Sequence, residues 1–359
     1  MEETAEKYRE LDIPLDCLVQ DWNTWEAGKW GNKRVDKKRY PDLAAMNRKL
    51  HDMHVHTMVS VWPNMNAGTE DYEEMKEAGL LLNDYATYDA FSEKGREIYW
   101  KQAERELFSG GFDSWWCDST EPFSGPDWNG EFKREPWERF RLVGDEHCKF
   151  LGAGRANLYA AAHAKGIYEN QRKAAPDKRV LNLTRSGYAS SQKYGTVLWS
   201  GDIYASWDTL KKQIHEGLNM CMSGMPYWTL DIGGFFTVNE NWQHRGCFCN
   251  EDPTPKWFWR GDYENGVDDY GYRELYVRWF EYGAFLPMFR SHGTDTPREV
   301  WNFGKKGEPF YDALVKTIEL RYRLMPYIYS NAARVWSEDY TMLRSLLFDL
   351  SLIHISEPT

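Results

Sequence analysis

The stretch that decides the fold is Gly111-Phe112-Asp113-Ser114-Trp115-Trp116-Cys117-Asp118-Ser119-Thr120-Glu121-Pro122. An aromatic, β-compatible run ends here in two carboxylates, Asp118 and Glu121, and Pro122 then stops regular structure. A buried strand presents an acid at its carboxyl end in this way, so Asp118 is a candidate nucleophile. The alternative is a core strand whose acids cap the next helix. The ends of the other strands distinguish the two interpretations.

Strand-like runs alternate with helical periodicity along the whole chain. The predicted strands are 13–22, 55–62, 112–118, 179–185, 196–202, 226–231 and 284–290. The predicted helices are 3–11, 41–53, 93–108, 136–173, 207–221, 272–282 and 309–336. Such alternation is typical of a parallel α/β sheet, and this many strands favours a (β/α) barrel of the TIM type over an open sheet. An irregular aromatic insertion follows Ile232-Gly233-Gly234 and extends to about Asp268.

Most predicted strands end in a polar or charged residue. These end residues are Asp21, Trp62, Asp118, Arg185, Asp202, Asp231 and His292. In a TIM-type barrel the carboxyl ends of all strands meet at one mouth, where the chemistry lies. Buried parallel strands are normally apolar throughout, so acids at successive ends are costly unless a ligand uses them.

The amino-acid composition indicates which classes of binding partner the protein can have. A net charge of −11 argues against nucleic acid or an anionic membrane, whose binding proteins are basic, and favours a neutral substrate. Aromatic residues make up 16% of the chain, with 18 Trp and 22 Tyr. Such rings stack on sugars as well as on one another, which suggests a carbohydrate site. The sequence carries no signal for an oligomeric state.

Neither a signal peptide nor a long apolar segment is visible, and the cysteines are scattered, which predicts reduced thiols in a cytoplasmic protein. His244, Cys247 and Cys249 have the composition of a metal site. They lack a paired Cys-x-x-Cys spacing and a second half-site, so no metal is predicted there. There is no Gly-rich phosphate loop, and no cofactor is expected.

Acids, an arginine and a histidine at a barrel mouth fit hydrolysis of a glycosidic bond, which needs one ionised and one protonated carboxyl group. We assign Asp118 as the nucleophile and Asp202 as the acid/base. Asp202 follows Leu198-Trp199-Ser200-Gly201, where burial would raise the pKa of its carboxyl group. The alternative for Asp202 is an N-cap of the helix that begins at Trp207.

The order of the motifs closely resembles glycoside hydrolase family 31, which holds retaining α-glucosidases and α-xylosidases. The resemblance runs from Ile13 to about Phe348. Its motifs are Trp115 to Pro122, Thr184-Arg185-Ser186 with Ser191-Gln192-Lys193-Tyr194-Gly195, Trp199-Ser200-Gly201-Asp202, Asp231-Ile232-Gly233-Gly234-Phe235 and Phe289-Arg290-Ser291-His292-Gly293.

This resemblance implies the same two catalytic acids and a set of residues that line the sugar subsite. The implied lining residues are Asp21, Trp62, Trp116, Arg185, Trp199, Asp231, Phe235 and His292. Arg185 would keep Asp118 ionised, and Glu121 would support the loop beyond it. The alternative for each lining residue is core packing or a surface ion pair.

Compared with the family, the chain departs at both ends. We expect residues 1–340 to form the barrel without its first strand, so that the aromatic insertion follows the seventh strand. Residues 341–359 would begin a missing C-terminal β-domain or be a foreign tail, because Leu350 to Thr359 do not resemble the family's continuation.

The sequence thus predicts a retaining, exo-acting α-glycosidase that removes a terminal α-xyloside or α-glucoside by double displacement. Trp115-Trp116 and the Tyr227 to Asp231 run favour the α-xylosidase side. Asn23 and the insertion after Phe235 leave open an α-N-acetylgalactosaminidase-type specificity. The alternative from another class is a carbohydrate-binding fragment without turnover.

Overall fold

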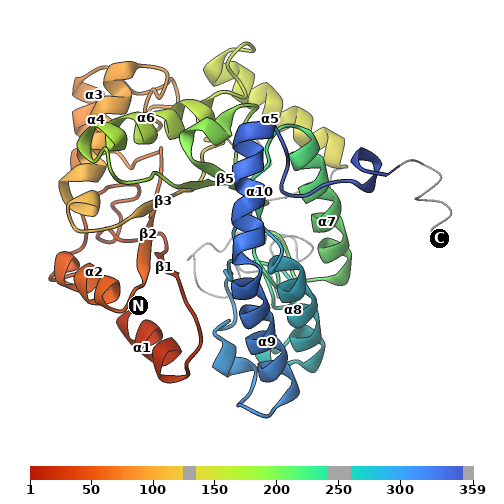
Figure 1. Ribbon diagram of the computed structural model, residues 1–359. Helices are drawn as coiled ribbons and strands as arrows, with labels where there is room; N and C mark the ends of the chain where they lie inside the picture. The colour runs from red at the N-terminus through yellow and green to blue at the C-terminus, as the bar shows by residue number, and fades with distance from the viewer. Residues whose placement is uncertain (124–134, 241–259, 351–359) are drawn as a thin grey trace. The chain divides into compact units, whose positions relative to one another are not determined.

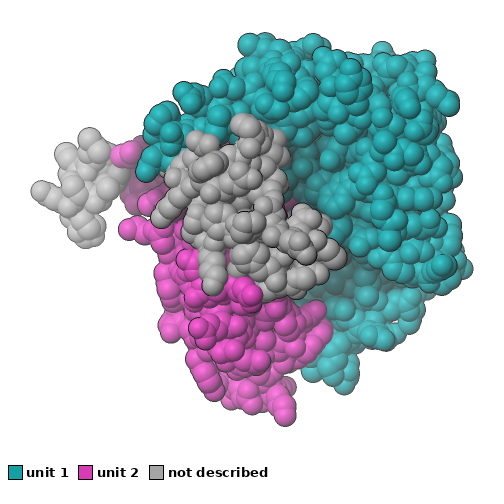
Figure 2. Space-filling view, turned by 180° about the vertical axis from the view of Figure 1, so that it is seen from behind, with its two compact units in different colours: residues 1–128, 132–197 teal, residues 129–131, 198–359 magenta. Residues whose placement is uncertain are grey.

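The computed structural model describes residues 1–123, 135–240 and 260–350. These residues form two compact units, unit 1 up to Val197 and unit 2 from Leu198 onward, coloured teal and magenta in Figure 2. His244, Cys247, Cys249 and much of the predicted aromatic insertion lie outside the described residues.

Unit 1 contains a parallel sheet whose strands pair in chain order (Figure 1). The strands are β1 (Cys17–Gln20), β2 (His56–Val61), β3 (Ser114–Cys117) and β4 (Asn182–Thr184). The register pairs Val59 with Trp115 and Trp115 with Asn182. Parallel neighbours require crossover connections, and helices supply them here. The predicted strand–helix alternation is therefore confirmed in this unit.

Helices lie before and between these strands. They are α1 (Glu2–Glu10), α2 (Leu43–Asp52), α3 (Glu70–Glu77), α4 (Glu93–Ala103), α5 (Pro136–Leu151) and α6 (Tyr159–Ala174). Three of them begin at side-chain caps that accept a backbone N–H of the first turn, namely Asp42, Thr69 and Ser92. Sequence periodicity missed α3, which is only a short helix.

The predicted single helix over 136–173 is wrong. Gly152 follows α5 with a φ of 78°, a left-handed conformation that glycine adopts readily. The chain then turns before α6 begins at Tyr159. The apolar periodicity continues across this break, so periodicity alone could not locate it.

The core of unit 1 lies between the sheet and helices α4 and α6, which lie side by side in Figure 1. Trp115 of β3 is fully buried, and its indole Nε1 donates to Gln171 Oε1 on α6 at 2.7 Å. Its ring centroid is 5.7 Å from that of Trp100 on α4. Neighbouring residues of a strand point to opposite faces, so Trp116 projects away from this core.

Unit 2 begins within β5 (Thr196–Trp199), which pairs in parallel with β6 (Trp228–Thr229). Its helices are α7 (Trp207–Met222), α8 (Tyr270–Gly283), α9 (Pro309–Arg323) and α10 (Met325–Glu338). The predicted helix over 309–336 is thus divided in two. Pro326, at the start of α10, lacks the N–H that an uninterrupted helix would use.

The predicted strand over 284–290 is also wrong, because the chain turns there after α8. Arg321 of α9 donates to the carbonyl oxygens of Ala284, Leu286 and Pro287. Pro287 in addition has no N–H for a sheet ladder. A buried side chain therefore satisfies the carbonyl groups that strand pairing would have used.

Among the described residues, Cys17, Cys117, Cys148 and Cys221 are free thiols. No helix in the described part of the chain combines the length and the apolar character needed to cross a bilayer.

Candidate active site

Four of the predicted site residues lie at one edge of the unit 1 sheet. Each follows directly on the last residue of its strand: Asp21 after β1, Trp62 after β2, Asp118 after β3 and Arg185 after β4. The strands are parallel, so their carboxyl ends share this edge. The sequence prediction that these residues gather at strand ends is confirmed within the unit.

Asp118 is held tightly at the end of β3. It is 8% exposed, and its backbone N–H donates to Val61 O of β2 at 3.0 Å. The Ser119 N–H donates to Asp118 Oδ1 at 2.8 Å. Arg185 Nη1 lies 3.6 Å from the same oxygen. A donor and a cation on one carboxylate favour its ionised form, which a nucleophile requires.

Arg185 also joins Asp118 to the loop that follows it. Its Nε donates to Glu121 Oε1 at 2.8 Å, and its Nη2 donates to Ser119 Oγ at 3.1 Å. The predicted role of Glu121 as a support for this loop agrees with these contacts. The next described helix is capped at Glu135, so neither Asp118 nor Glu121 serves as its cap.

Tryptophans gather around the ends of β1 and β2. The Trp30 ring centroid lies 4.6 Å from that of Trp62, 5.1 Å from Trp22 and 5.7 Å from Trp25. Asp21 Oδ1 accepts the N–H of Trp22 at 2.6 Å. Sequence reasoning named Trp62 and missed Trp22, Trp25 and Trp30, although three tryptophans so close together in one loop were a visible signal.

In unit 2, Trp199 is the last residue of β5 and is 2% exposed. Asp202 follows three residues later and is exposed, so burial of its carboxyl group was wrongly expected. The helix-cap alternative for Asp202 is also wrong. Ser206 caps α7, and its side chain accepts the Thr209 N–H at 3.0 Å.

Asp231 lies two residues beyond β6 and is fully buried. Its Oδ1 accepts from Arg290 Nη1, and the guanidinium of Arg290 lies 5.8 Å from the Trp199 ring centroid. Burial raises the pKa of Asp231 to about 7, with a further rise from the negative charge of Asp202. Arg290 opposes this rise. Sequence reasoning quoted the motif that contains Arg290 but did not select it.

Phe235 and His292 lie together, with ring centroids 5.4 Å apart. Burial, followed by the charges of Arg290 and Arg298, lowers the pKa of His292 well below its usual value, which keeps the ring neutral. Arg298 links the two segments that carry these rings. Its Nη2 donates to Phe235 O at 3.2 Å, and its Nη1 donates to Thr294 O at 2.9 Å. Sequence reasoning missed Arg298, which gave no signal.

Within the ranges that the structure describes, no group of three or more His, Cys, Asp or Glu side chains could hold a metal ion. The groups that the residues described above supply are carboxylates, guanidinium groups, a neutral imidazole and aromatic rings.

A parallel β/α fold with polar and charged residues at the carboxyl ends of its strands is typical of the general class of TIM-type barrel domains. The profile of the family "Glycosyl hydrolases family 31 TIM-barrel domain" matches residues 1–331. The chain therefore belongs to glycosyl hydrolase family 31, which confirms the resemblance that the sequence motifs indicated.

Similar proteins include both xylosidases and a glucosidase. The chain is 33% identical to an α-xylosidase from Saccharolobus solfataricus, over 96% of this chain and 42% of that protein. It is 29% identical to an uncharacterized family 31 glucosidase, ORF2, from Pseudescherichia vulneris, over 82% of this chain and 50% of that protein. A crystal structure of the family 31 α-xylosidase from Xanthomonas citri superimposes with a TM-score of 0.80 at 33% identity, over 97% of this chain and 36% of that one. The chain thus spans half or less of the length of each.

Proposed function

We propose that this chain carries the catalytic residues of a retaining, exo-acting α-glycosidase with α-xylosides as preferred substrates. One observation carries the proposal: Asp118 is a nearly buried carboxylate at a strand end, held between the Ser119 N–H and the Arg185 guanidinium. Membership of family 31 supports it, as do the relatives named α-xylosidase.

In the first step, a carboxylate oxygen of Asp118 attacks the anomeric carbon of the terminal sugar. The bond from that carbon to the leaving oxygen breaks, and Asp202 gives its proton to this oxygen. The product is a β-linked glycosyl ester on Asp118. Arg185 keeps the attacking group ionised beforehand, and the loop contacts through Glu121 keep it in place.

In the second step, Asp202 removes a proton from water while the water oxygen attacks the anomeric carbon. The ester bond to Asp118 breaks and the carboxylate is restored. Two inversions give the α-anomer, which is net retention. The exposure of Asp202 suits a group that must meet both the leaving group and water.

The other residues predicted to line the subsite are proposed to bind the sugar. Asp231 and His292 would hydrogen-bond hydroxyl groups, and the half-buried Trp62 would offer a ring face for stacking. Trp116 and Trp199, which are almost fully buried, would form the aromatic wall behind the sugar. In the described structure, the side-chain oxygen of Asn23 already accepts from Arg39 Nη2 at 3.0 Å. Because this oxygen is already bonded, Asn23 gives no support for an N-acetylated sugar. An α-N-acetylgalactosaminide is nevertheless included among the test substrates.

Asp118→Ala tests the proposal in the whole protein. We expect kcat on p-nitrophenyl α-xyloside to fall by about four orders of magnitude or more, because the covalent step is lost. Sodium azide should restore part of the turnover and give a β-glycosyl azide. The matched control is Asp113→Ala, an acid at the opposite end of the same strand, which should keep most activity. If Asp118→Ala stays active, the assignment of the nucleophile is wrong.

The substrate and the stereochemistry need a separate measurement. p-Nitrophenyl α-xyloside, α-glucoside and α-N-acetylgalactosaminide should be compared, with the first product anomer identified by NMR. We expect the highest kcat/KM for the xyloside and an α-anomer as first product. A β-anomer would exclude retention. Calorimetric sugar binding without turnover of any of the three would instead favour the carbohydrate-binding fragment.

A further inference from the structure

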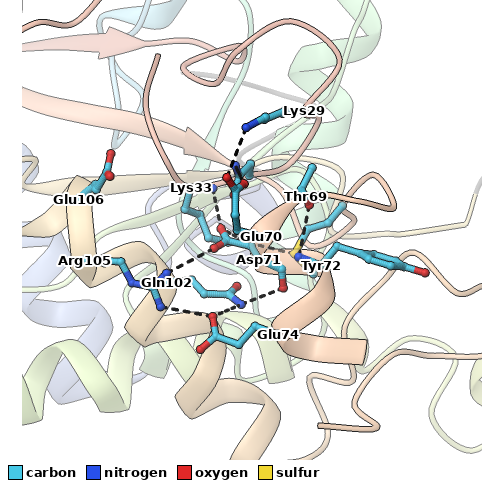
Figure 3. Close-up of polar contacts among 12 residues, drawn as sticks. Lys29, Lys33, Thr69, Glu70, Asp71, Tyr72, Glu74, Gln102, Arg105 and Glu106 are labelled. Atoms are coloured by element: carbon cyan, nitrogen blue, oxygen red, sulfur yellow. Dashed lines mark hydrogen bonds and ion pairs between the residues drawn. The ribbon is translucent and has the colours of Figure 1, made fainter. Parts of the chain in front are cut away.

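A charged pair is buried in unit 1, between the loop after β1 and helix α3. Lys33 and Asp71 are 2% and 1% exposed, and Lys33 Nζ lies 3.8 Å from Asp71 Oδ2. The Lys33 backbone N–H donates to the same oxygen at 2.7 Å (Figure 3). Burying two charges costs about as much as their attraction returns, so such a pair seldom exists for stability alone. A buried ion pair can instead favour one conformation of the chain segments that carry its two residues.

The pair fixes the turn that follows Trp30. Lys33 Nζ donates to Gly31 O at 3.2 Å, and Asn32 Nδ2 donates to Glu70 Oε2 at 3.0 Å. Gly31 has a φ of +75°, and a Cβ at this position would lie 2.0 Å from Asn64 O, so only glycine fits. The turn is therefore pressed against the chain just beyond β2.

The same ammonium group also supports Trp62. It lies 4.2 Å from the centroid of the Tyr99 ring, within range of a cation–π contact. Tyr99 Oη donates to Trp62 O at 2.9 Å. The Trp30 and Trp62 rings meet edge to face at 4.6 Å. The Lys33 ammonium group thus contacts both the turn that follows Trp30 and the Tyr99 side chain that is hydrogen-bonded to Trp62.

We propose that Lys33 and Asp71 are positioning residues for substrate binding, whose buried ion pair holds Trp30 against Trp62 and so sets the aromatic surface at the end of β2. The inference rests on the proposed function, because it takes this surface to bind the terminal sugar. Neither residue needs to touch the substrate.

The proposal predicts a pH dependence. Burial lowers the pKa of Lys33 to about 8, while the charges of Asp71 and Glu74 oppose the shift. Below this value the ammonium is charged and the pair is intact; above it the charge and the pair are lost. The titratable and charged groups that face Lys33 from the packed helices are Asp71 and Glu74 of α3, Tyr99 of α4 and His163 of α6. Arg105, after α4, lies 3.9 Å from the other carboxylate oxygen of Asp71.

The double variant Lys33→Met/Asp71→Leu tests the proposal. It replaces both charges by apolar groups of similar size, which commonly preserves stability. We expect an unchanged Tm, a KM for p-nitrophenyl α-xyloside raised by about three- to tenfold, and kcat within about twofold of wild type. KM of the wild type should rise between pH 7 and 9 relative to that of the double variant. A wild-type KM and pH profile in a stable double variant would overturn the proposal.

Two further variants make the test decisive. Lys37→Met is the matched control, since Lys37 lies in the same loop but pairs at the surface with Glu106, and its KM should not change. Tyr99→Phe keeps the ring near Lys33 and removes only the bond to Trp62 O. We expect a raised KM, and a normal KM would overturn the proposal even if the double variant did not fold.

A spectroscopic readout separates this inference from the proposed function. Closely packed indole rings couple in the near-ultraviolet circular dichroism spectrum, and that signal requires no turnover. The double variant should lose the part of the spectrum that Trp30→Phe also removes. If the wild type hydrolyses no glycoside, the proposed function fails, while an unchanged spectrum in the double variant would refute the positioning role on its own.

Discussion

At the scale of single residues, Asp231 shows how burial can override pairing. Its carboxyl group is fully buried and bonded to Arg290, yet its pKa lies near 7 because desolvation penalises the charged form most. Close to neutral pH, such a carboxyl group can carry a proton. It could then donate a hydrogen bond to a sugar hydroxyl, which an ionised Asp118 cannot do.

This shift gives a testable link between pH and stability. The folded protein binds the Asp231 proton more tightly than the unfolded chain, whose carboxyl pKa is the usual 3.8. The free energy of unfolding that protonation of Asp231 contributes is therefore fully present below about pH 4. It is lost as the pH rises from about 4 to 7. Relative to Asp231→Asn, the wild type should lose about 1–3 kcal/mol of unfolding free energy between pH 5 and pH 8.

Urea unfolding of the whole protein at several pH values measures this difference. Asp208→Asn is the matched control, because Asp208 is exposed and pairs with Lys212 on the surface of α7. The control should follow the wild-type dependence on pH. If Asp231→Asn also follows it, the carboxyl group of Asp231 titrates in its ordinary range and does not donate to the substrate at neutral pH.

At the scale of elements, side chains replace strand pairing where the sequence predicted a strand over 284–290. Arg321 of α9 is buried and satisfies three carbonyl groups of this segment. Thr229 of β6 adds a bond from its Oγ1 to Met288 O at 2.8 Å. The segment that leads to His292 is thereby fixed by α9 and β6 and needs no ladder of its own.

Arg321→Met should be strongly destabilising, because it leaves three buried carbonyl groups without their donor. We expect a loss of about 3–5 kcal/mol in unfolding free energy. Arg323→Met on the same helix serves as control, since Arg323 is exposed and should change stability by less than about 0.5 kcal/mol. Chemical denaturation of both variants measures the difference. Similar stabilities would mean that Arg321 does not hold the segment.

At the scale of the whole molecule, the sequence predicts features that follow from the repeating strand–helix pattern. It misses features that depend on individual tertiary contacts. Strand ends such as Asp118 and Arg185 could be predicted because a parallel sheet brings all its carboxyl ends to one edge. Lys33 could not, because a lysine in a loop rich in Trp and Gly reads as exposed. Its burial depends on α3, a short helix that periodicity did not reveal.

The breaks in the long helices show the same limit. Gly152 and Pro326 were visible in the sequence, but glycine and proline occur inside helical patterns as well as at their ends. The exposed position of Asp202 depends on where its neighbours pack, and its apolar neighbours in sequence suggested burial instead. Local sequence thus predicts element types better than it predicts which side chains face solvent.

The net charge of −11 gives a prediction for the whole molecule, because it acts at long range on any charged ligand. A neutral glycoside experiences no such force, so its KM should change by less than about twofold between 50 mM and 500 mM NaCl. An anionic sugar would be repelled at low salt, and its KM would fall severalfold as salt screens the repulsion. Steady-state kinetics with p-nitrophenyl α-xyloside and its uronic acid analogue separate the two. A preference for the acid, with KM rising with salt, would mean that Arg185 or Arg290 recognises a carboxylate, and the neutral-substrate prediction would be wrong.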